Sequence, residues 1–172
     1  MKKIKLLLGT IAVIGGLFLF SGQTTYASTT HWDRAPKALK GEWQTATHKT
    51  PKKYSNLENR YYWKNLEVTN KIFQLNTFML NKHKVHDYES GPHGAYSHVY
   101  SLAFEKVSSR RYYVWGSMLN YGSSKAQAGF GIVLSHSHKH LKLYSFKAKM
   151  KHGYVDFTNR HYEGYYRRGM SH

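Results

Sequence analysis

Three imidazoles stand at alternate positions in the segment His136-Ser137-His138-Lys139-His140. On an extended strand, alternate side chains point the same way about 7 Å apart, so two of these histidines could share a metal ion with a third ligand from elsewhere. Candidates for that third ligand are His83, His86 and Asp87. Lys139 and Lys142 would repel a dication, and no cysteine or carboxylate cluster accompanies the motif. We therefore favour a polar hairpin turn between residues 130–134 and 141–144.

A second group of histidines lies in His83-Lys84-Val85-His86-Asp87 and Gly91-Pro92-His93-Gly94, which we expect around a loop. His86 or His93 could act as a general base oriented by Asp87. Their spacing matches no nucleophile motif, and the chain has no phosphate-cradling glycine loop. The nine carboxylates are scattered singly, so a catalytic pair would have to meet in space. We expect neither an enzyme nor a cofactor.

Tyrosine is unusually frequent, with 15 residues, several of them in adjacent pairs beside arginines. Aromatic faces next to guanidinium groups can stack bases or sugar rings while the cations bind phosphates. The residues predicted to bind in this way are Arg60, Tyr62, Arg110, Arg111, Tyr113, Arg167 and Arg168. This hypothesis requires a concave aromatic strip rimmed by Lys and Arg. The alternative is that strand alternation buries one tyrosine of each pair and exposes the other.

The elements that position these side chains are predicted to be strands. Segments rich in Tyr, Phe, Val and Trp alternate with polar clusters, and no segment after residue 40 combines helical periodicity with caps. Strands are expected at Glu42 to Thr47, Arg60 to Leu66, Lys71 to Leu80, Tyr96 to Lys106, Arg110 to Leu119, Phe130 to Ser135, Leu141 to Lys147 and Gly153 to Asn159. The predicted fold is all-β.

Two strands show the period of two clearly. In residues 98–105, His98, Tyr100, Leu102 and Phe104 share the face that we expect to be buried. In residues 111–118, both faces carry aromatic bulk, which predicts packing on each side of that strand.

Seven or eight short strands on one chain point to a single small antiparallel β-barrel or a two-sheet sandwich. Gly41-Glu42-Trp43 follows a short helical turn and resembles the Gly-x-Trp that opens the first strand of lipocalins, where the Trp plugs the closed end of the barrel. The resemblance implies a calycin-like barrel, and an Arg near the last strand that packs on Trp43. Arg160, Arg167 and Arg168 are all available for that contact.

The opening Pro36-Lys37-Ala38-Leu39-Lys40-Gly41-Glu42-Trp43, followed by Tyr-rich strands, also resembles small secreted proteins of lactobacilli with a Pro-x-x-Leu-[Lys/Arg]-Gly-x-Trp opening. The function of those proteins is largely uncharacterised. The resemblance therefore implies secretion and a fold built from Tyr-rich strands, but it implies no activity.

Residues 1–27 have the form of a secretory signal peptide, with three lysines, an apolar run from Leu6 to Phe20 and small residues at Thr25 and Ala27. The alternative is an uncleaved membrane anchor, but the run is shorter than the roughly 20 residues of a stable span. Residues 28–40 then form a polar lead with a short helical turn, and residues 41–172 a single all-β domain. The absence of cysteine suits an exporter that does not depend on oxidative folding, such as a Gram-positive bacterium.

Charge gives the broadest functional constraint. The chain carries 26 Lys and Arg against nine acids, a net charge of +17; removing the three signal-peptide lysines leaves 23 against nine, or +14. All 12 histidines lie after residue 27, so mild acidification would raise this charge further. Outside a cell, such a charge favours anionic cell-wall polymer, acidic lipid headgroups or extracellular DNA, although charge alone also serves solubility.

The hypothesis that we favour is a secreted, monomeric, non-enzymatic binding module without a stable transmembrane segment, held on anionic polymer by charge. The first alternative is a lipocalin-like or calycin-like carrier of a small apolar ligand. The second is a cationic antimicrobial factor.

Overall fold

The computed structural model describes residues 29–55, 59–96, 101–118, 127–151 and 154–169, so the predicted signal peptide lies outside it. Its described residues form 11 strands, and one 3₁₀ turn, η2, spans Lys52–Tyr54. The strands are β1 (Thr29–Trp32), β2 (Gly41–Thr45), β3 (His48–Lys49), β4 (Tyr61–Val68), β5 (Ile72–Leu80), β6 (His86–Tyr96), β7 (Ala103–Lys106), β8 (Arg111–Met118), β9 (Gln127–Leu134), β10 (His140–Lys151) and β11 (Tyr154–Arg168). The prediction of an all-β fold is confirmed.

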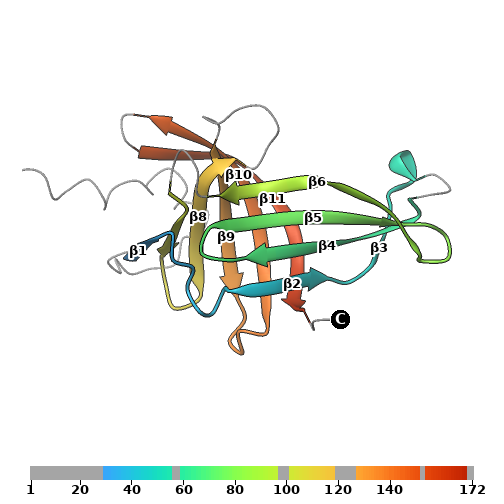
Figure 1. Cartoon of the computed structure of the whole chain (residues 1–172), viewed down its shortest axis with the longest axis horizontal. Helices are drawn as coiled ribbons and strands as arrows, with labels where there is room; N and C mark the ends of the chain where they lie inside the picture. Colours follow the sequence, from blue (N-terminus) through green and yellow to red (C-terminus); the bar gives the residue numbers. More distant parts are fainter. Residues whose placement is uncertain (1–28, 56–58, 97–100, 119–126, 152–153, 170–172) are drawn as a thin grey trace, which may run out of the picture.

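All strands belong to one antiparallel sheet with the order β1-β7-β8-β6-β5-β4-β2-β11-β10-β9, in which β3 pairs β4 and β8 also pairs β9. The sheet is not closed into a barrel, which corrects that prediction. The ladder from β6 to β8 has only two residue pairs, whereas β4 and β5 share eight. Figure 1 shows β2, β4, β5 and β6 crossing the direction of β8 to β11, and the far ends of β4, β5 and β6 projecting from the body.

The segments His83 to Asp87 and Gly91 to Gly94 were expected around a loop, but residues 86–96 form strand β6. Its pairing with β5 runs from Ile72↔Tyr96 to Leu80↔His86, and this long-range ladder outweighs the local turn preference of Gly and Pro. Conversely, the strand expected over residues 96–106 is reduced to the four residues of β7, and residues 97–100 lie outside the described part of the chain.

The main core lies between the crossing parts of the sheet. Its fully buried large side chains are Trp43, Tyr166, Phe73, Phe104, Phe130, Leu39, Leu66, Leu102, Ile132, Leu134, Leu141 and Leu143. Strand β8 contributes Tyr112 and Val114 to this core, while Tyr113 and Trp115 join a second cluster with Phe157. The prediction that both faces of this strand are packed is confirmed.

Trp43 on β2 is held by Arg168 of the neighbouring strand β11 and by the turn that precedes β2. The guanidinium carbon of Arg168 lies 4.4 Å from the centroid of the Trp43 ring, and the indole Nε1 donates to the Leu39 carbonyl oxygen at 2.8 Å. Arg168 also donates to the carbonyl oxygens of Lys40 (2.9 Å) and Ala38 (2.7 Å). Gly41 has φ +106°, which glycine adopts without strain, and this conformation brings the chain from the preceding turn into β2. Of the three arginines available for Trp43, the structure therefore selects Arg168.

Candidate functional site

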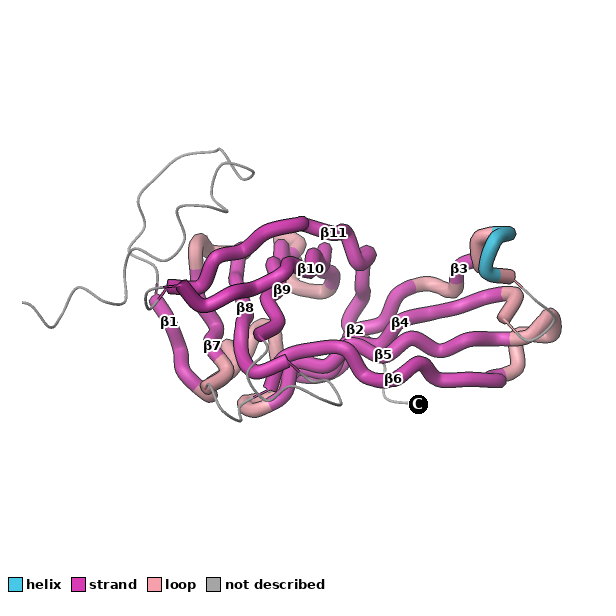
Figure 2. The backbone as a smooth tube through the Cα atoms, turned by 90° about the horizontal axis from the view of Figure 1, so that it is seen from above, coloured by secondary structure: helices cyan, strands magenta, loops and turns pink. Residues whose placement is uncertain are grey.

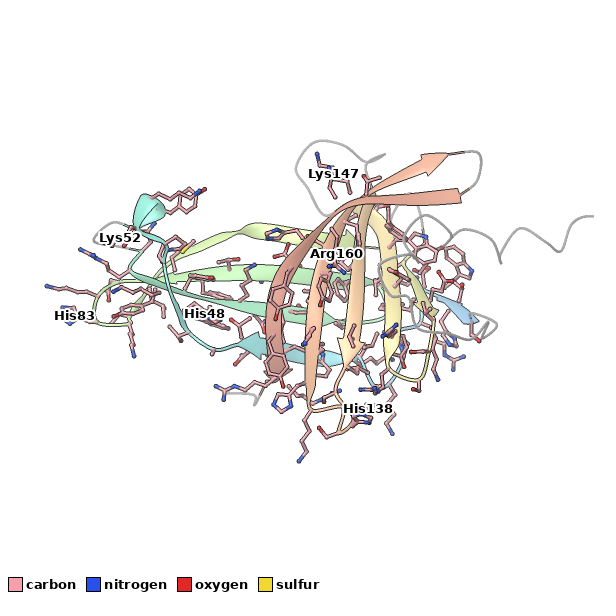
Figure 3. All side chains as sticks on the ribbon, turned by 180° about the vertical axis from the view of Figure 1, so that it is seen from behind. His48, Lys52, His83, His138, Lys147 and Arg160 are labelled. Atoms are coloured by element: carbon pink, nitrogen blue, oxygen red, sulfur yellow. The ribbon has the colours of Figure 1, made fainter. Side chains whose placement is uncertain are left out.

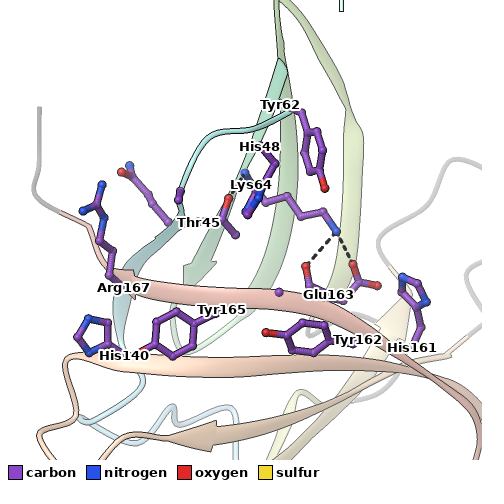
Figure 4. A pocket seen from close by; sticks show the side chains of 13 residues that line it. Thr45, His48, Tyr62, Lys64, His140, His161, Tyr162, Glu163, Tyr165 and Arg167 are labelled. Atoms are coloured by element: carbon purple, nitrogen blue, oxygen red, sulfur yellow. Dashed lines mark hydrogen bonds and ion pairs between the residues drawn. The ribbon is translucent and has the colours of Figure 1, made fainter. Parts of the chain in front are cut away.

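A cleft of about 570 Å³ lies between β2, β3 and β4 on one side and β11 with the start of β10 on the other (Figure 4). It is lined by Gln44, Thr45, Ala46, His48, Tyr62, Lys64, His140, His161, Tyr162, Glu163, Gly164, Tyr165 and Arg167. Strand β11 pairs β2 only from Tyr166↔Thr45 to Arg168↔Trp43. The part of β11 before Tyr166 has no partner in β2, and the cleft opens there.

A β-bulge shapes the β11 wall. Leu143 faces Gly164 across the ladder and Tyr144 faces Tyr162, so Glu163 is the extra residue on β11. Gly164 has φ +142°, and a Cβ at this position would lie 3.3 Å from side-chain carbons of Thr45 and Tyr166. Both the backbone conformation and the close approach require glycine here. The bulge changes which side chains of β11 face the cleft.

Glu163 is held in the cleft by three hydrogen bonds from two side chains. Lys64 Nζ lies 2.7 Å from Glu163 Oε2 and also donates to the Glu163 carbonyl oxygen at 3.2 Å, while Ser145 Oγ donates to Oε1 at 2.6 Å. The two charged side chains are only 19% and 11% exposed. Burial by itself raises the pKa of Glu163, but the bonds from Lys64 and Ser145 outweigh it and hold this pKa below its ordinary value. Glu163 is therefore an ionised but neutralised group.

Besides this ion pair, the cleft is lined by one arginine and three histidines. Arg167 and His161 are exposed on β11, His48 is exposed on β3, and His140 is half-buried at the start of β10. Because Lys64 and Glu163 cancel, Arg167 gives the cleft a net positive charge at neutral pH. The cleft is suited to an anion.

Aromatic rings line the same cleft. The Tyr165 ring stacks on His140 at 5.2 Å with an interplanar angle of 12°, and the Tyr62 ring lies 5.5 Å from that of His48. Tyr162 and Tyr165 are about half exposed, at 51% and 50%. Burial, and then its neighbours Tyr144 and Tyr165, raise the pKa of Tyr162, so its hydroxyl remains a hydrogen-bond donor. Flat, exposed rings beside cations can hold sugar rings or bases.

Two of the seven residues predicted to bind, Tyr62 and Arg167, meet at this cleft. Arg60 is exposed just before β4, and Arg110 and Arg111 lie where the β7–β8 turn enters β8. Arg168 is committed to Trp43.

Tyr113 was predicted to bind a ligand, and its burial shows that this prediction is wrong. It is only 4% exposed and stacks on Phe157 at 5.5 Å, because its face of β8 is covered by β11. It is therefore not available to a ligand. The pair Tyr165 and Tyr166 does follow the alternation, with Tyr165 exposed and Tyr166 fully buried.

The histidine motif forms a hairpin turn between β9 and β10. Residues 136–139 lie in the turn, His138 has φ +56°, and its N–H donates to the Ser135 carbonyl oxygen at 3.1 Å. Because His136 and His138 are not in a strand, the alternation assumed for a metal site does not hold. Among the described residues, no group of three or more His, Asp or Glu side chains could hold a metal ion. The side chains of His86, Asp87 and His93 lie outside that description, and His83 lies in the β5–β6 turn.

Several residues of the cleft were missed from sequence, among them His48, Lys64, His161 and Glu163. They come from separate strands and form no local motif. Only the Glu163-Gly164 step, a glycine inside a strand pattern, offered a local signal of a bulge.

Comparison with protein-family models, with curated proteins and with solved structures found no match. In the described residues, no helix is long and apolar enough to cross a membrane. Fold and site together define an antiparallel β-sheet protein with a cationic, tyrosine-lined cleft.

Proposed function

We propose that this protein is a secreted, non-enzymatic binding module that holds a phosphate-rich anionic polymer outside the cell. The observation that carries this proposal is the charge pattern of the cleft. Among the described lining residues, Glu163 is the one carboxylate; Lys64 neutralises its charge, and Ser145 donates a hydrogen bond to it. Arg167 remains as the charged group that attracts an anion, and three histidines line the cleft with it.

The arrangement suits a polymer whose phosphodiesters alternate with rings or short polyols. Phosphate oxygens would accept hydrogen bonds from Arg167, since a guanidinium matches the geometry of a phosphate. A ring of the ligand would lie against Tyr165 or Tyr162, which are exposed and already held in place by neighbouring rings. The net charge, +14 once the three signal-peptide lysines are removed, would draw such polymers in from a distance.

Phosphodiester chemistry is shared by wall teichoic acid and by extracellular DNA, so the experiment needs both. A chain beginning at Ser28 is incubated with purified Gram-positive cell walls, with the same walls after acid removal of teichoic acid, and with duplex DNA. Retention only by untreated walls assigns the wall polymer, and equal binding to DNA assigns phosphodiesters in general. On DNA, neutralising three phosphates predicts a loss of roughly 40-fold in affinity between 50 and 200 mM NaCl. Binding that is unchanged in 0.5 M NaCl would refute the proposal.

A matched pair of variants tests the cleft itself. Arg167→Gln removes the charge at the cleft, while Arg34→Gln removes the same charge from an exposed position before the Ala35–Lys40 turn. Loss of one charge-assisted phosphate contact predicts a decrease of about tenfold for Arg167→Gln. Arg34→Gln should change affinity less than twofold. Equal losses would mean that net charge alone, and not the cleft, carries the binding.

The lipocalin-like carrier remains a second proposal because the Trp43–Arg168 contact matches the arrangement that the Gly-x-Trp resemblance implies. The interior counts against it. Trp43, Phe73, Phe130 and Tyr166 fill the centre of the main core, and the Phe73 and Phe130 ring centroids are 4.7 Å apart. A fluorescent fatty acid that binds to the Ser28–His172 chain, and is displaced by unlabelled ligand, would support this alternative.

A further inference from the structure

The far end of β4 and β5 projects away from the main core and ends in a compact tip (Figure 2). We define the fingertip as described residues 49–55, 59–61 and 80–85. The register brings its parts together, because Tyr61 pairs with both Lys49 and Leu80. Lys84 Nζ lies 5.7 Å from the centroid of the Tyr61 ring. Figure 3 shows Lys52 and His83 together at this end, far from Lys147 and His138.

The fingertip is strongly basic. Its exposed cations are Lys49, Lys52, Lys53, Arg60, Lys82 and Lys84, and its described residues include no acid. The nearest acids in the sequence are Glu58 and Asp87. Even when both are counted, six cations against two acids leave a formal charge of +4.

Two large apolar side chains stand out of this basic surface. Tyr54 is 62% exposed and Val85 is 58% exposed, and they are two of the five large hydrophobic residues exposed in the described chain. Tyr54 follows Lys52 and Lys53, and Lys53 Nζ lies 4.5 Å from the centroid of the Tyr54 ring. Val85 directly follows Lys84. Each apolar group is thus flanked by cations.

Backbone hydrogen bonds hold both apolar groups in their exposed positions. Asn81 Oδ1 accepts from the N–H groups of His83 (2.9 Å) and Val85 (3.1 Å), and the Asn81 N–H donates to the Val85 carbonyl oxygen at 3.1 Å. The Tyr54 N–H donates to the Pro51 carbonyl oxygen at 2.9 Å. Because both turns are ordered in advance, docking of the tip has a small entropic cost.

We infer that the fingertip docks on an anionic lipid bilayer. The lysines contact lipid phosphates, and Tyr54 and Val85 enter the boundary between headgroups and acyl chains. A soluble polyanion would pair with the cations but would leave the two apolar groups in water. An anionic bilayer interface can pair with the cations and also bury the apolar groups. The surface lies at the tip and not in the cleft, so this inference does not depend on the proposed polymer binding.

The test is cosedimentation of the Ser28–His172 chain, which retains all 11 strands, with vesicles at 0.15 M NaCl. Vesicles of 70% phosphatidylcholine and 30% phosphatidylglycerol are compared with pure phosphatidylcholine. We expect binding to the anionic vesicles and little to the neutral ones. Lys52→Gln with Lys53→Gln should lower the partition coefficient about 25-fold, because each lysine at an anionic surface contributes about fivefold.

The control is Lys142→Gln with Lys147→Gln, which makes the same charge change at exposed positions of β10. It should lower partition less than threefold. Tyr54→Ser with Val85→Ser leaves the charge unchanged and should lower partition about tenfold, since it removes the inserted apolar groups. The inference is wrong if the two lysine pairs have equal effects, or if the Tyr54 and Val85 variant partitions like the wild type.

Two further measurements separate this inference from the proposed function. Arg167→Gln should leave vesicle partition unchanged, and the fingertip variants should keep the Arg167-dependent part of polymer binding. A Tyr54→Trp variant should shift its fluorescence to shorter wavelength on anionic vesicles if residue 54 enters the interface. An unshifted spectrum with bound vesicles would contradict insertion.

Discussion

Arg168 allows the most direct test of how the end of β11 is joined to β2 and to the turn that precedes β2. The Arg168→Ala variant removes two hydrogen bonds, to the carbonyl oxygens of Lys40 and Ala38, together with the guanidinium over Trp43. Since Arg168 is exposed, water replaces part of each hydrogen bond, and we take about 1 kcal/mol for each. The cation–π contact adds about 0.5–1 kcal/mol. The free energy of unfolding should therefore fall by about 2.5 kcal/mol.

The neighbouring Arg167 provides the control. It is also exposed and has the same charge, but it lines the cleft, whereas the hydrogen bonds to the Lys40 and Ala38 carbonyl oxygens come from Arg168. Arg167→Ala should change stability by less than about 0.5 kcal/mol. Arg168→Lys keeps the charge but loses the planar fork, and should fall between the two.

Urea unfolding of the Ser28–His172 chain, followed by tryptophan fluorescence, measures all three variants. For a domain of this size, Arg168→Ala should also lower the melting temperature by about 5–10 °C. If Arg168→Ala and Arg167→Ala lose the same free energy, the contact with Trp43 contributes nothing specific, and the account of this junction is wrong.

Three other substitutions test the bulge, the sheet and the core. Glu163→Gln should lower stability by about 2 kcal/mol at pH 7, because Lys64 keeps a buried charge without its ionic partner. The folded-state pKa of Glu163 is depressed, so the carboxylate stabilises the folded protein above the ordinary pKa of 4.5, and this stabilisation is lost as pH falls through the lower folded-state pKa. The urea unfolding midpoints of the Glu163→Gln variant and the wild type should therefore converge in acid. Gly94→Ala should lower the free energy of unfolding by about 3 kcal/mol or prevent folding, because a Cβ would overlap the Phe73 carbonyl oxygen. As a control, Gly169→Ala should melt like the wild type, because the nearest atom to its Cβ is the Glu42 carbonyl oxygen at 3.4 Å. Tyr166→Phe should leave stability unchanged or raise it by up to about 1 kcal/mol, since the buried hydroxyl has no hydrogen-bond partner in the described residues. Burial raises the pKa of Tyr166, so above about pH 10 the variant should lose less stability than the wild type. A clear loss of stability at pH 7 would contradict this reasoning.

Alternation was sufficient to predict strand β8. Tyr112 and Val114 alternate with Tyr113 and Trp115, and each set enters a different core. The pattern did not say which partners cover each face, so Tyr113 was assigned to a binding surface although Phe157 covers it. A period of two depends only on neighbouring residues, whereas burial depends on strands far away in the chain.

The cleft could not be predicted from local sequence pattern for the same reason. Its residues come from β2, β3, β4, β10 and β11, and its shape depends on where β11 leaves β2 and on the bulge at Glu163. A bulge moves one residue out of register, so the side chains that follow it exchange faces. The glycine in Glu163-Gly164 is a local signal of a bulge, but no local sequence pattern predicts that Lys64 of β4 lies beside Glu163.

Composition and local pattern by themselves determined the positive charge, the lack of disulfides, the all-β class and the importance of Trp43. Charge is a sum over residues and alternation is a property of neighbours, so neither needs the fold. Tertiary structure decided that Arg168 rather than Arg160 or Arg167 covers Trp43, that Phe157 covers Tyr113, and that the sheet does not close. Each of these depends on pairing between distant strands, and small shifts of register change which side chains meet.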